Sequence, residues 1–323
     1  MILAPRPPFV KQKRNLTTRG PAFSPYLGIS LGIAAVSTAA IFITYAQRAG
    51  APSLVIAAYR LTIASLVLLP LVVRRHRAEA ALLTRRTLGL ALISGLFLGL
   101  HFATWISSLA YTSVASSLVM VSTSPLFVAL ISALGLRERL SAAMVGGMLV
   151  ALAGGVAVGL SDACTRAGCP PLAEFFQGQA VYGDLLAVVG AMGAAVYLVI
   201  GRNLRASMSL TLYIFLTYGT AAIVLCLAVV AAGLPVAGYA PRTYLWFGLL
   251  ALVPQLIGHT SFNWALRYLP ATYVSVTVLG EPLGSTVLAF LFLRQTPSLL
   301  KILGGVLILG GILFAARRAP QAA

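Results

Sequence analysis

Long apolar runs separated by short polar or charged interruptions fill this sequence from residue 26 to residue 316. The runs are apolar on all sides, and they end where charged residues, proline or glycine occur. Each is close to the about 20 residues that a helix needs to cross the hydrocarbon core of a membrane. They predict ten membrane-spanning helices, at residues 26–47, 54–73, 87–107, 114–134, 141–160, 179–201, 209–232, 244–266, 271–293 and 298–316.

Composition agrees with an all-α membrane protein. The chain is 59% hydrophobic and 9% charged, with a mean hydropathy of +0.95 over 323 residues, whereas soluble domains are about 25% charged. Outer-membrane barrels are excluded, because their strands alternate polar and apolar residues. Residues 1–25 hold five Lys or Arg and lack the apolar stretch of a signal peptide, so we expect a basic cytoplasmic tail there.

The distribution of lysine and arginine predicts the orientation. With the N-terminus inside, the inner segments hold 17 of these residues and the outer loops hold five. This excess follows the positive-inside rule, so the net charge of +17 reflects topology and contact with anionic lipid. No basic face with interleaved aromatics suggests nucleic acid. We expect a multi-pass protein of the plasma (inner) membrane with both termini in the cytoplasm.

An internal repeat divides the chain into two halves. A shift of 157 residues aligns the special residues of one half with those of the other, in the pairs Tyr111/Tyr268, Pro125/Pro282, Arg137/Arg294, Gly147/Gly304 and Gly154/Gly311. Each half carries five predicted spans, and an odd number means that the second half enters the membrane from the opposite side. The repeat is therefore predicted to be inverted. Many secondary transporters use this arrangement to open a central site alternately to each side.

The residues of both halves resemble the EamA family of the drug/metabolite transporter superfamily over nearly all of residues 26–316. The stretches that carry the resemblance are AAYRLTIASLVLLPLVVRR, TSPLFVALISALGLRERLSAAMVGGMLVALAGGVAV, YGDLLAVVGAMGAAVYLVIGRNLR and VLGEPLGSTVLAFLFLRQTPSLLKILGGVLILGGILF. The resemblance implies a ten-helix exporter or permease with two inverted five-helix repeats around a central cavity. One departure is that the family's acidic residue after the fourth span is Glu138 in the first half but Gln295 in the second.

These features predict the organisation of the chain. A basic tail, 1–25, precedes a first five-helix repeat, 26–160. An extracytoplasmic loop, 161–178, joins it to a second repeat, 179–316, and a short cytoplasmic tail, 317–323, follows.

Glu281 is the charged residue of the ninth predicted span, and Pro282 follows it directly. It lies about ten residues into the span, or about 15 Å into a core of about 30 Å. One interpretation is a proline kink whose carboxylate is satisfied by neighbouring donors. The other is functional: the repeat places Ser124 before Pro125 at the equivalent position, so the shared proline suffices for a kink and the charge appears once. The second interpretation predicts a proton-binding carboxylate or the partner of a substrate cation.

Arg60 is the other charged residue inside a predicted span, about six residues from the outer side. Its side chain is expected to snorkel outward to the lipid headgroups. The alternative is that it extends inward, to pair with Glu281 or to hold the carboxylate or phosphate of a substrate.

Two histidines lie at corresponding places in the third span of each half. His101 and His259 are followed by Trp105 and Trp264, and Asn263 accompanies the second pair. Satisfied interior groups and cavity-lining groups are both open interpretations. With Tyr111 from the repeat, the candidate substrate-binding or coupling residues are Glu281, His101, His259, Trp105, Asn263, Trp264, Arg60 and Tyr111.

The three cysteines and the absent motifs complete the sequence evidence. Cys164 and Cys169 flank a short turn in the predicted outer loop, where a disulfide is plausible because that side is oxidising. Cys226 lies in a span and is expected to be a small core residue. No third metal ligand accompanies the histidines, so neither a metal nor a cofactor is predicted.

The sequence favours a secondary transporter for a small amphipathic metabolite such as an amino acid. Membrane lipid and the small-molecule substrate are the expected partners, with protons as a hypothetical coupling ion. No HExxH, GxSxG or Walker sequence supports an enzyme or an ATP-driven pump. The alternatives are a lipid flippase and, less favoured, an intramembrane enzyme. Substrate, direction, coupling ion and oligomeric state are not determined by the sequence.

Overall fold

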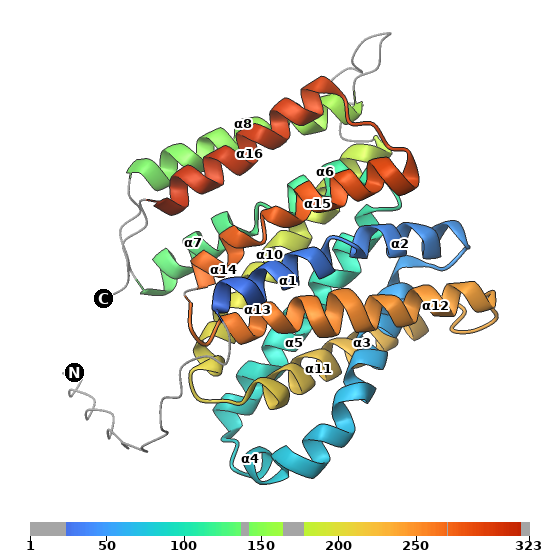
Figure 1. Cartoon of the computed structure of the whole chain (residues 1–323), viewed down its shortest axis with the longest axis vertical. Helices are drawn as coiled ribbons and strands as arrows, with labels where there is room; N and C mark the ends of the chain where they lie inside the picture. The colour runs from blue at the N-terminus through green and yellow to red at the C-terminus, as the bar shows by residue number, and fades with distance from the viewer. Residues whose placement is uncertain (1–23, 137–141, 164–177, 270, 318–323) are drawn as a thin grey trace.

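The chain is a bundle of helices in the computed structural model, which describes residues 24–136, 142–163, 178–269 and 271–317 (Figure 1). Every regular element in these ranges is a helix. The first part contains α1 Pro25–Val36, α2 Ala39–Arg48, α3 Ser53–Leu71, η1 Val72–His76, α4 Arg77–Ala81, α5 Arg85–Ser108, α6 Val114–Val121, α7 Ser124–Leu136 and α8 Ala142–Ala163. The second contains α10 Gln179–Arg205, α11 Leu210–Ala231, α12 Pro241–Leu250, η2 Ala251–His259, α13 Thr260–Ala265, α14 Ala271–Thr277, α15 Gly280–Leu288, η3 Ala289–Leu293 and α16 Leu299–Arg317.

Eight stretches of helix in the described residues are long and apolar enough to cross a membrane. They are Pro25–Arg48, Ser53–Ala81, Arg85–Ser108, Val114–Ile131, Gln179–Arg205, Leu210–Ala231, Pro241–Ala265 and Val274–Leu293. The predicted spans 141–160 and 298–316 contain the shorter apolar stretches Leu149–Val158 and Leu299–Gly311. The protein is thus an all-helical membrane protein, and the count of ten spans stays a prediction.

Several of these long apolar stretches are interrupted near their middle. Between α1 and α2, the hydroxyls of Ser37 and Thr38 bond back to Ile33 and Ala35 carbonyls at 2.8 and 2.7 Å. Between α6 and α7, the Thr123 hydroxyl bonds back to the Met120 carbonyl at 2.8 Å. Such side-chain bonds compete with the helical ladder and bend it. The irregular backbone at these interruptions is tolerated in a membrane because it is buried in protein.

Proline fixes the position of two of these interruptions. Pro125 lies in the first turn of α7 and Pro282 in the first turn of α15. Proline has no N–H to donate and its ring clashes with the preceding turn of a helix, so it is favoured at a helix start and breaks a helix interior. Each proline therefore begins a new helix just after a break in the span.

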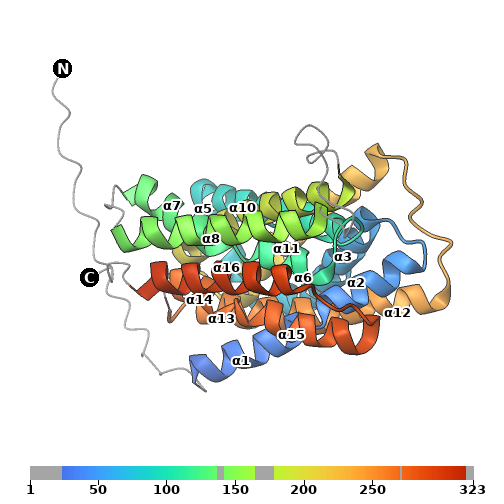
Figure 2. The same cartoon turned by 90° about the horizontal axis from the view of Figure 1, so that it is seen from above.

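Glycines bring α8 and α16 into close contact, and the two helices lie side by side in both Figure 1 and Figure 2. A Cβ added to Gly154 would lie 2.6 Å from the Gly304 carbonyl oxygen, and one added to Gly311 would lie 2.6 Å from the Gly147 carbonyl oxygen. No larger residue fits at either contact without a shift of backbone. Small residues of this kind let membrane helices approach closely.

Candidate functional site

A central cavity of about 70 Å³ lies where the interrupted helices meet. Its walls come from α5, from the break between α6 and α7, from α10, from η2 and α13, and from the break between α14 and α15. Both sequence halves therefore contribute. The lining residues are His101, Trp105, Val121, Ser122, Ser124, Ala194, Tyr197, Leu198, His259, Phe262, Ser275, Val278, Leu279 and Glu281.

Glu281 is the acidic residue of this lining. It is the second residue of α15, and its backbone N–H bonds to the Val278 carbonyl at 2.8 Å. The partial positive charge of the helix start favours a carboxylate there. No hydrogen bond to the Glu281 carboxylate is found among the described residues. Ser124, which the 157-residue shift pairs with Glu281, lines the same cavity. The cavity thus has one acidic wall that presents an unbonded carboxylate.

The two histidines lie close together on another part of the wall. Their ring centres are 6.4 Å apart. His101 Nδ1 is 2.9 Å from the Gly190 carbonyl oxygen, and since a carbonyl only accepts, Nδ1 is the donor. Trp105 stacks on the His101 ring at 5.9 Å with an interplanar angle of 6°. The structure brings together His101, His259, Trp105 and Glu281 as cavity-lining residues, whereas their roles stay predictions.

Arg60 lies behind this wall, fully buried at 0% exposure. Its Nε donates to Gln255 Oε1 at 2.8 Å, and its guanidinium carbon lies 4.1 Å from the centre of the Phe102 ring. The expectation that Arg60 snorkels to the headgroups is wrong, because the side chain turns inward to these two partners. Arg60 is within electrostatic range of Glu281, but the described residues show no ion pair between them.

The two terminal guanidinium nitrogens of Arg60 are the unusual feature behind the cavity wall. Both are buried and neither has a hydrogen-bond partner. Phe102 packs against both Arg60 and His259. The centres of the Phe102 and His259 rings are 5.2 Å apart. Arg60 therefore stands one side chain behind the cavity wall. A buried cation with unsatisfied donors is costly, so the arrangement suits a site that receives an anionic group.

Asn263, on α13, belongs to a second group of buried polar side chains, which comes from the second half of the sequence. Its Nδ2 donates to the Tyr197 hydroxyl, and to the His259 carbonyl at 2.8 Å. Tyr197 lines the cavity, whereas Asn263 is 1% exposed and does not. Asn263 is placed to orient Tyr197 rather than to touch a solute in the cavity.

Two candidate residues lie away from the cavity. Tyr111 follows the end of α5, is exposed, and packs edge-on against Tyr182 at 5.1 Å between ring centres. Trp264 packs against Tyr268 at 5.0 Å. Neither lines the cavity in this structure.

The cysteines divide between described and undescribed parts of the chain. Cys164 and Cys169, with the proposed disulfide, lie outside the described residues. The expectation that Cys226 is a core residue is wrong, because its side chain is exposed on α11 and lies 3.7 Å from the Thr62 hydroxyl. The sequence of α11 is apolar on every side, so its pattern did not distinguish the inner face from the outer one.

Several lining residues were not found from the sequence. Ser122, Ser275 and Phe262 line the cavity, but serine and phenylalanine inside an apolar run resemble ordinary packing residues. The signal that was available is proximity to a break, since Ser122 precedes Pro125 by three residues. In the described residues, no group of three or more His, Cys, Asp or Glu is placed to hold a metal ion.

Comparison with known proteins identifies the family. Residues 26–160 and 181–317 each match the model of the EamA-like transporter family. The chain is similar to an uncharacterized transporter of Archaeoglobus fulgidus, 25% identical over 90% of this chain and 95% of that one. A second uncharacterized transporter of the same organism is 24% identical over 66% of this chain and 71% of its own.

A solved crystal structure shares the fold. It superposes with a TM-score of 0.63 over 92% of this chain and 100% of its own, at 23% sequence identity. The two family matches together cover most of the sequence, so the chain belongs to the EamA-like transporter family. It is a membrane transporter.

Proposed function

We propose that this protein moves a small amphipathic metabolite, such as an amino acid, across the plasma membrane by alternating access. Ten spans form two inverted five-helix repeats, with both termini in the cytoplasm and the substrate site between the repeats. The observation that carries the proposal is the central cavity, whose walls come from both halves and include the unbonded carboxylate of Glu281. Rocking of one repeat against the other opens such a site to each side in turn.

The glycine contacts between α8 and α16 support the inverted repeat. The shift of 157 residues pairs Gly147 with Gly304 and Gly154 with Gly311. The contacts join Gly154 to Gly304 and Gly147 to Gly311, so an exchange of the two halves converts one contact into the other. As one helix is followed forward, the other is followed backward. Equivalent helices that cross antiparallel are what an in-plane twofold axis produces.

The size and chemistry of the cavity support a small substrate. Its volume of about 70 Å³ is well below the about 300–1,000 Å³ of pockets for drug-sized ligands. Trp105, Phe262 and Tyr197 offer aromatic surface. Glu281 suits an ammonium group, and the unsatisfied nitrogens of Arg60 suit a carboxylate once Phe102 moves aside. A zwitterionic solute satisfies both charges, which is why an amino acid is the proposed example.

Glu281 is also the proposed site of proton coupling. A carboxylate on the cavity wall can be reached from whichever side is open, so it can take up a proton on one side and release it on the other. Ionised Glu281 attracts Arg60 or a substrate cation, whereas protonated Glu281 does not. Protonation thereby biases the equilibrium between the two orientations of the repeats.

Transport of radiolabelled amino acids into proteoliposomes, with and without an imposed pH gradient, tests this function. Accumulation of unchanged solute that follows the gradient supports the proposal. Translocation of a labelled phospholipid with no movement of soluble solutes would favour a lipid flippase instead, and recovery of a chemically altered product would favour an intramembrane enzyme.

A further inference from the structure

An apolar groove of about 460 Å³ lies between α3 and α11, away from the central cavity. Leu66, Leu69, Ile223 and Leu227 on its rim are exposed large hydrophobic side chains, so the groove opens to the hydrocarbon of the bilayer. Gly219 leaves open space on the α11 side, since a Cβ added there would meet no heavy atom within 4 Å. The groove is therefore an apolar channel within a lipid-facing surface.

The polar groups of the groove need no ligand. The Ser65 hydroxyl donates to the Leu61 carbonyl at 2.7 Å. The Thr62 hydroxyl oxygen and the Cys226 sulfur lie 3.7 Å apart and share a hydrogen bond. Since every polar side chain of the lining is already bonded within the protein, the groove suits an unbranched hydrocarbon chain rather than a polar solute.

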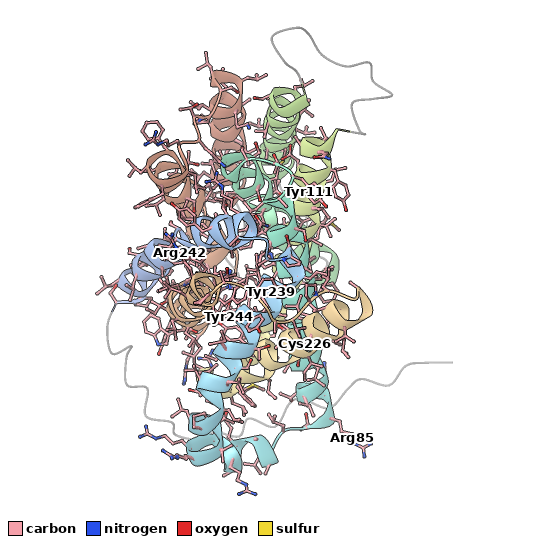
Figure 3. The ribbon with its side chains drawn as sticks, turned by 90° about the vertical axis from the view of Figure 1, so that its right-hand side faces the viewer. Arg85, Tyr111, Cys226, Tyr239, Arg242 and Tyr244 are labelled. Carbon is pink, nitrogen blue, oxygen red and sulfur yellow. The ribbon has the colours of Figure 1, made fainter. Side chains whose placement is uncertain are left out.

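Arginines gather at one end of this groove. Leu69 and Phe215 form the end nearest to η1, which continues α3 and packs against α11. Five exposed arginines follow within a short stretch of η1, α4 and the start of α5: Arg74, Arg75, Arg77, Arg85 and Arg86. Arg74 is five residues beyond Leu69, a distance along the helix of less than about 10 Å. Figure 3 shows Cys226 on α11 and Arg85 at the far end of the bundle, pointing outward.

Residues 74–86, which carry these arginines, are held beside α11, and the positive charges of the arginines are not neutralised by carboxylates in the described part of the chain. Glu79 Oε1 accepts the backbone N–H of Ser209, which caps α11, at 2.7 Å, and Glu79 Oε2 lies 3.0 Å from His76 Nδ1. The acidic residue of the segment is thus engaged in holding α4 to the start of α11. In the described ranges no ion pair joins any of the five arginines to a carboxylate. Their guanidinium groups remain available to phosphate oxygens, which they bind as a bidentate fork.

We propose that this surface is a binding site for one anionic phospholipid, with an acyl chain in the α3/α11 groove and the headgroup phosphate on the arginines of η1 and α4. The groove alone would accept any lipid, and the arginines alone would attract any anion. Because the groove and the arginines are continuous along α3, the surface selects a molecule that has both an acyl chain and an anionic headgroup. The site is separate from the central cavity and does not depend on the proposed substrate.

Native mass spectrometry of the delipidated protein in detergent, titrated with phosphatidylglycerol or phosphatidylcholine of the same chains, tests the proposal. The parent protein should retain one phosphatidylglycerol and bind it about tenfold more tightly than phosphatidylcholine. Arg74→Gln with Arg75→Gln should remove this preference. Arg242→Gln, on an exposed arginine of α12, should leave it unchanged. Equal binding of the two lipids by the parent would overturn the proposal.

Gly219→Leu tests the groove separately from the charge. The leucine side chain starts in open space, since its Cβ meets no heavy atom within 4 Å, so it should occupy the groove and weaken the binding of both lipids while the protein stays folded. Gly248→Leu is the matched control, because a Cβ at Gly248 also meets nothing within 4 Å and lies outside the groove. Unchanged lipid binding in Gly219→Leu would show that no acyl chain occupies the groove.

Cys226 provides a direct reporter. With Cys164 and Cys169 replaced by serine, it is the remaining thiol of the chain. Phosphatidylglycerol should slow its reaction with a membrane-soluble maleimide, and glycerol phosphate without acyl chains should not. Protection by glycerol phosphate alone would indicate a simple anion site and would overturn the assignment of a lipid.

Discussion

The break between α6 and α7 and the break between α14 and α15 are aligned by the 157-residue shift, yet they differ in charge. Both are followed by proline, and both contribute to the central cavity. At the aligned position the first break carries Ser124 and the second carries Glu281. The two halves share other features, such as the glycines of α8 and α16. The shared glycines serve the packing of the two halves, whereas a charge that occurs at this break in one half only is a candidate for chemistry that needs a single site.

The largest expected effect comes from removing the charge that distinguishes the two breaks. Glu281→Gln keeps the size of the side chain and mimics its protonated form. We expect exchange of substrate down a gradient to continue and accumulation driven by a pH gradient to be lost, by at least about tenfold, the scale expected for loss of a positioned charge. Proteoliposome uptake with and without the gradient measures both.

Ser124→Ala is the matched control for this substitution. It should retain the response to the pH gradient, because a serine hydroxyl does not titrate in the physiological range. If Glu281→Gln accumulates substrate as well as the parent does, Glu281 is a structural residue of the break and the two breaks are functionally equivalent.

Arg60 and Arg205 extend the comparison to two buried arginines. Arg205 is 2% exposed, and its nitrogens donate to the Asn263 carbonyl at 3.1 Å and to the Met208 carbonyl. Arg60 leaves both terminal nitrogens unbonded. Arg205→Met should therefore lower the stability by about 1.5–3 kcal/mol, the range for hydrogen bonds to a charged group. Arg60→Met should cost less stability than Arg205→Met, because it removes two unsatisfied buried donors together with the single bond to Gln255, and it should abolish transport.

Thermal melting in detergent and proteoliposome uptake together test this pair. Equal losses of stability in Arg60→Met and Arg205→Met would mean that Arg60 is a structural residue satisfied by Gln255 and Phe102 alone.

The sequence was sufficient to predict the helical class and the family, and it placed Glu281 near the middle of its span, but it left both interpretations of His101 and His259 open. Apolar runs and the internal repeat are properties of sequence spacing, so they needed no structure. The direction of Arg60 was not predictable in this way, because outward snorkelling and inward burial require the same helix position. Its inward direction depends on Gln255 and Phe102, which come from other helices. Cys226 was misplaced for a related reason, since α11 has no polar face to mark its outer side.

The shared glycines should give equal effects in the two halves. Gly154→Ala and Gly311→Ala each introduce a Cβ 2.6 Å from a carbonyl oxygen of the opposite helix. Overpacking of this kind costs about 1–3 kcal/mol, so both should lower the melting temperature by similar amounts. Gly248→Ala, where the added Cβ meets nothing within 4 Å, should have little effect. A large difference between the first two would show that the contacts of α8 and α16 are not related by the repeat.

The smallest effect is expected in the loop that joins the halves, at Cys164 and Cys169. If the two are bridged, the loop that the disulfide closes is short, so its stabilisation should fall below the about 3 kcal/mol of a 15-residue loop. Replacement of both by serine should leave transport and folding largely intact.

In reduced intact cells an impermeant maleimide should label the parent protein, because the excess of inner lysine and arginine places this loop outside. The variant that keeps only Cys226 should not be labelled, since that thiol faces the membrane on α11. Labelling of the parent only after lysis would reverse the predicted orientation. Loss of folded protein in the double serine variant would mean that the two repeats need the joining loop in order to assemble.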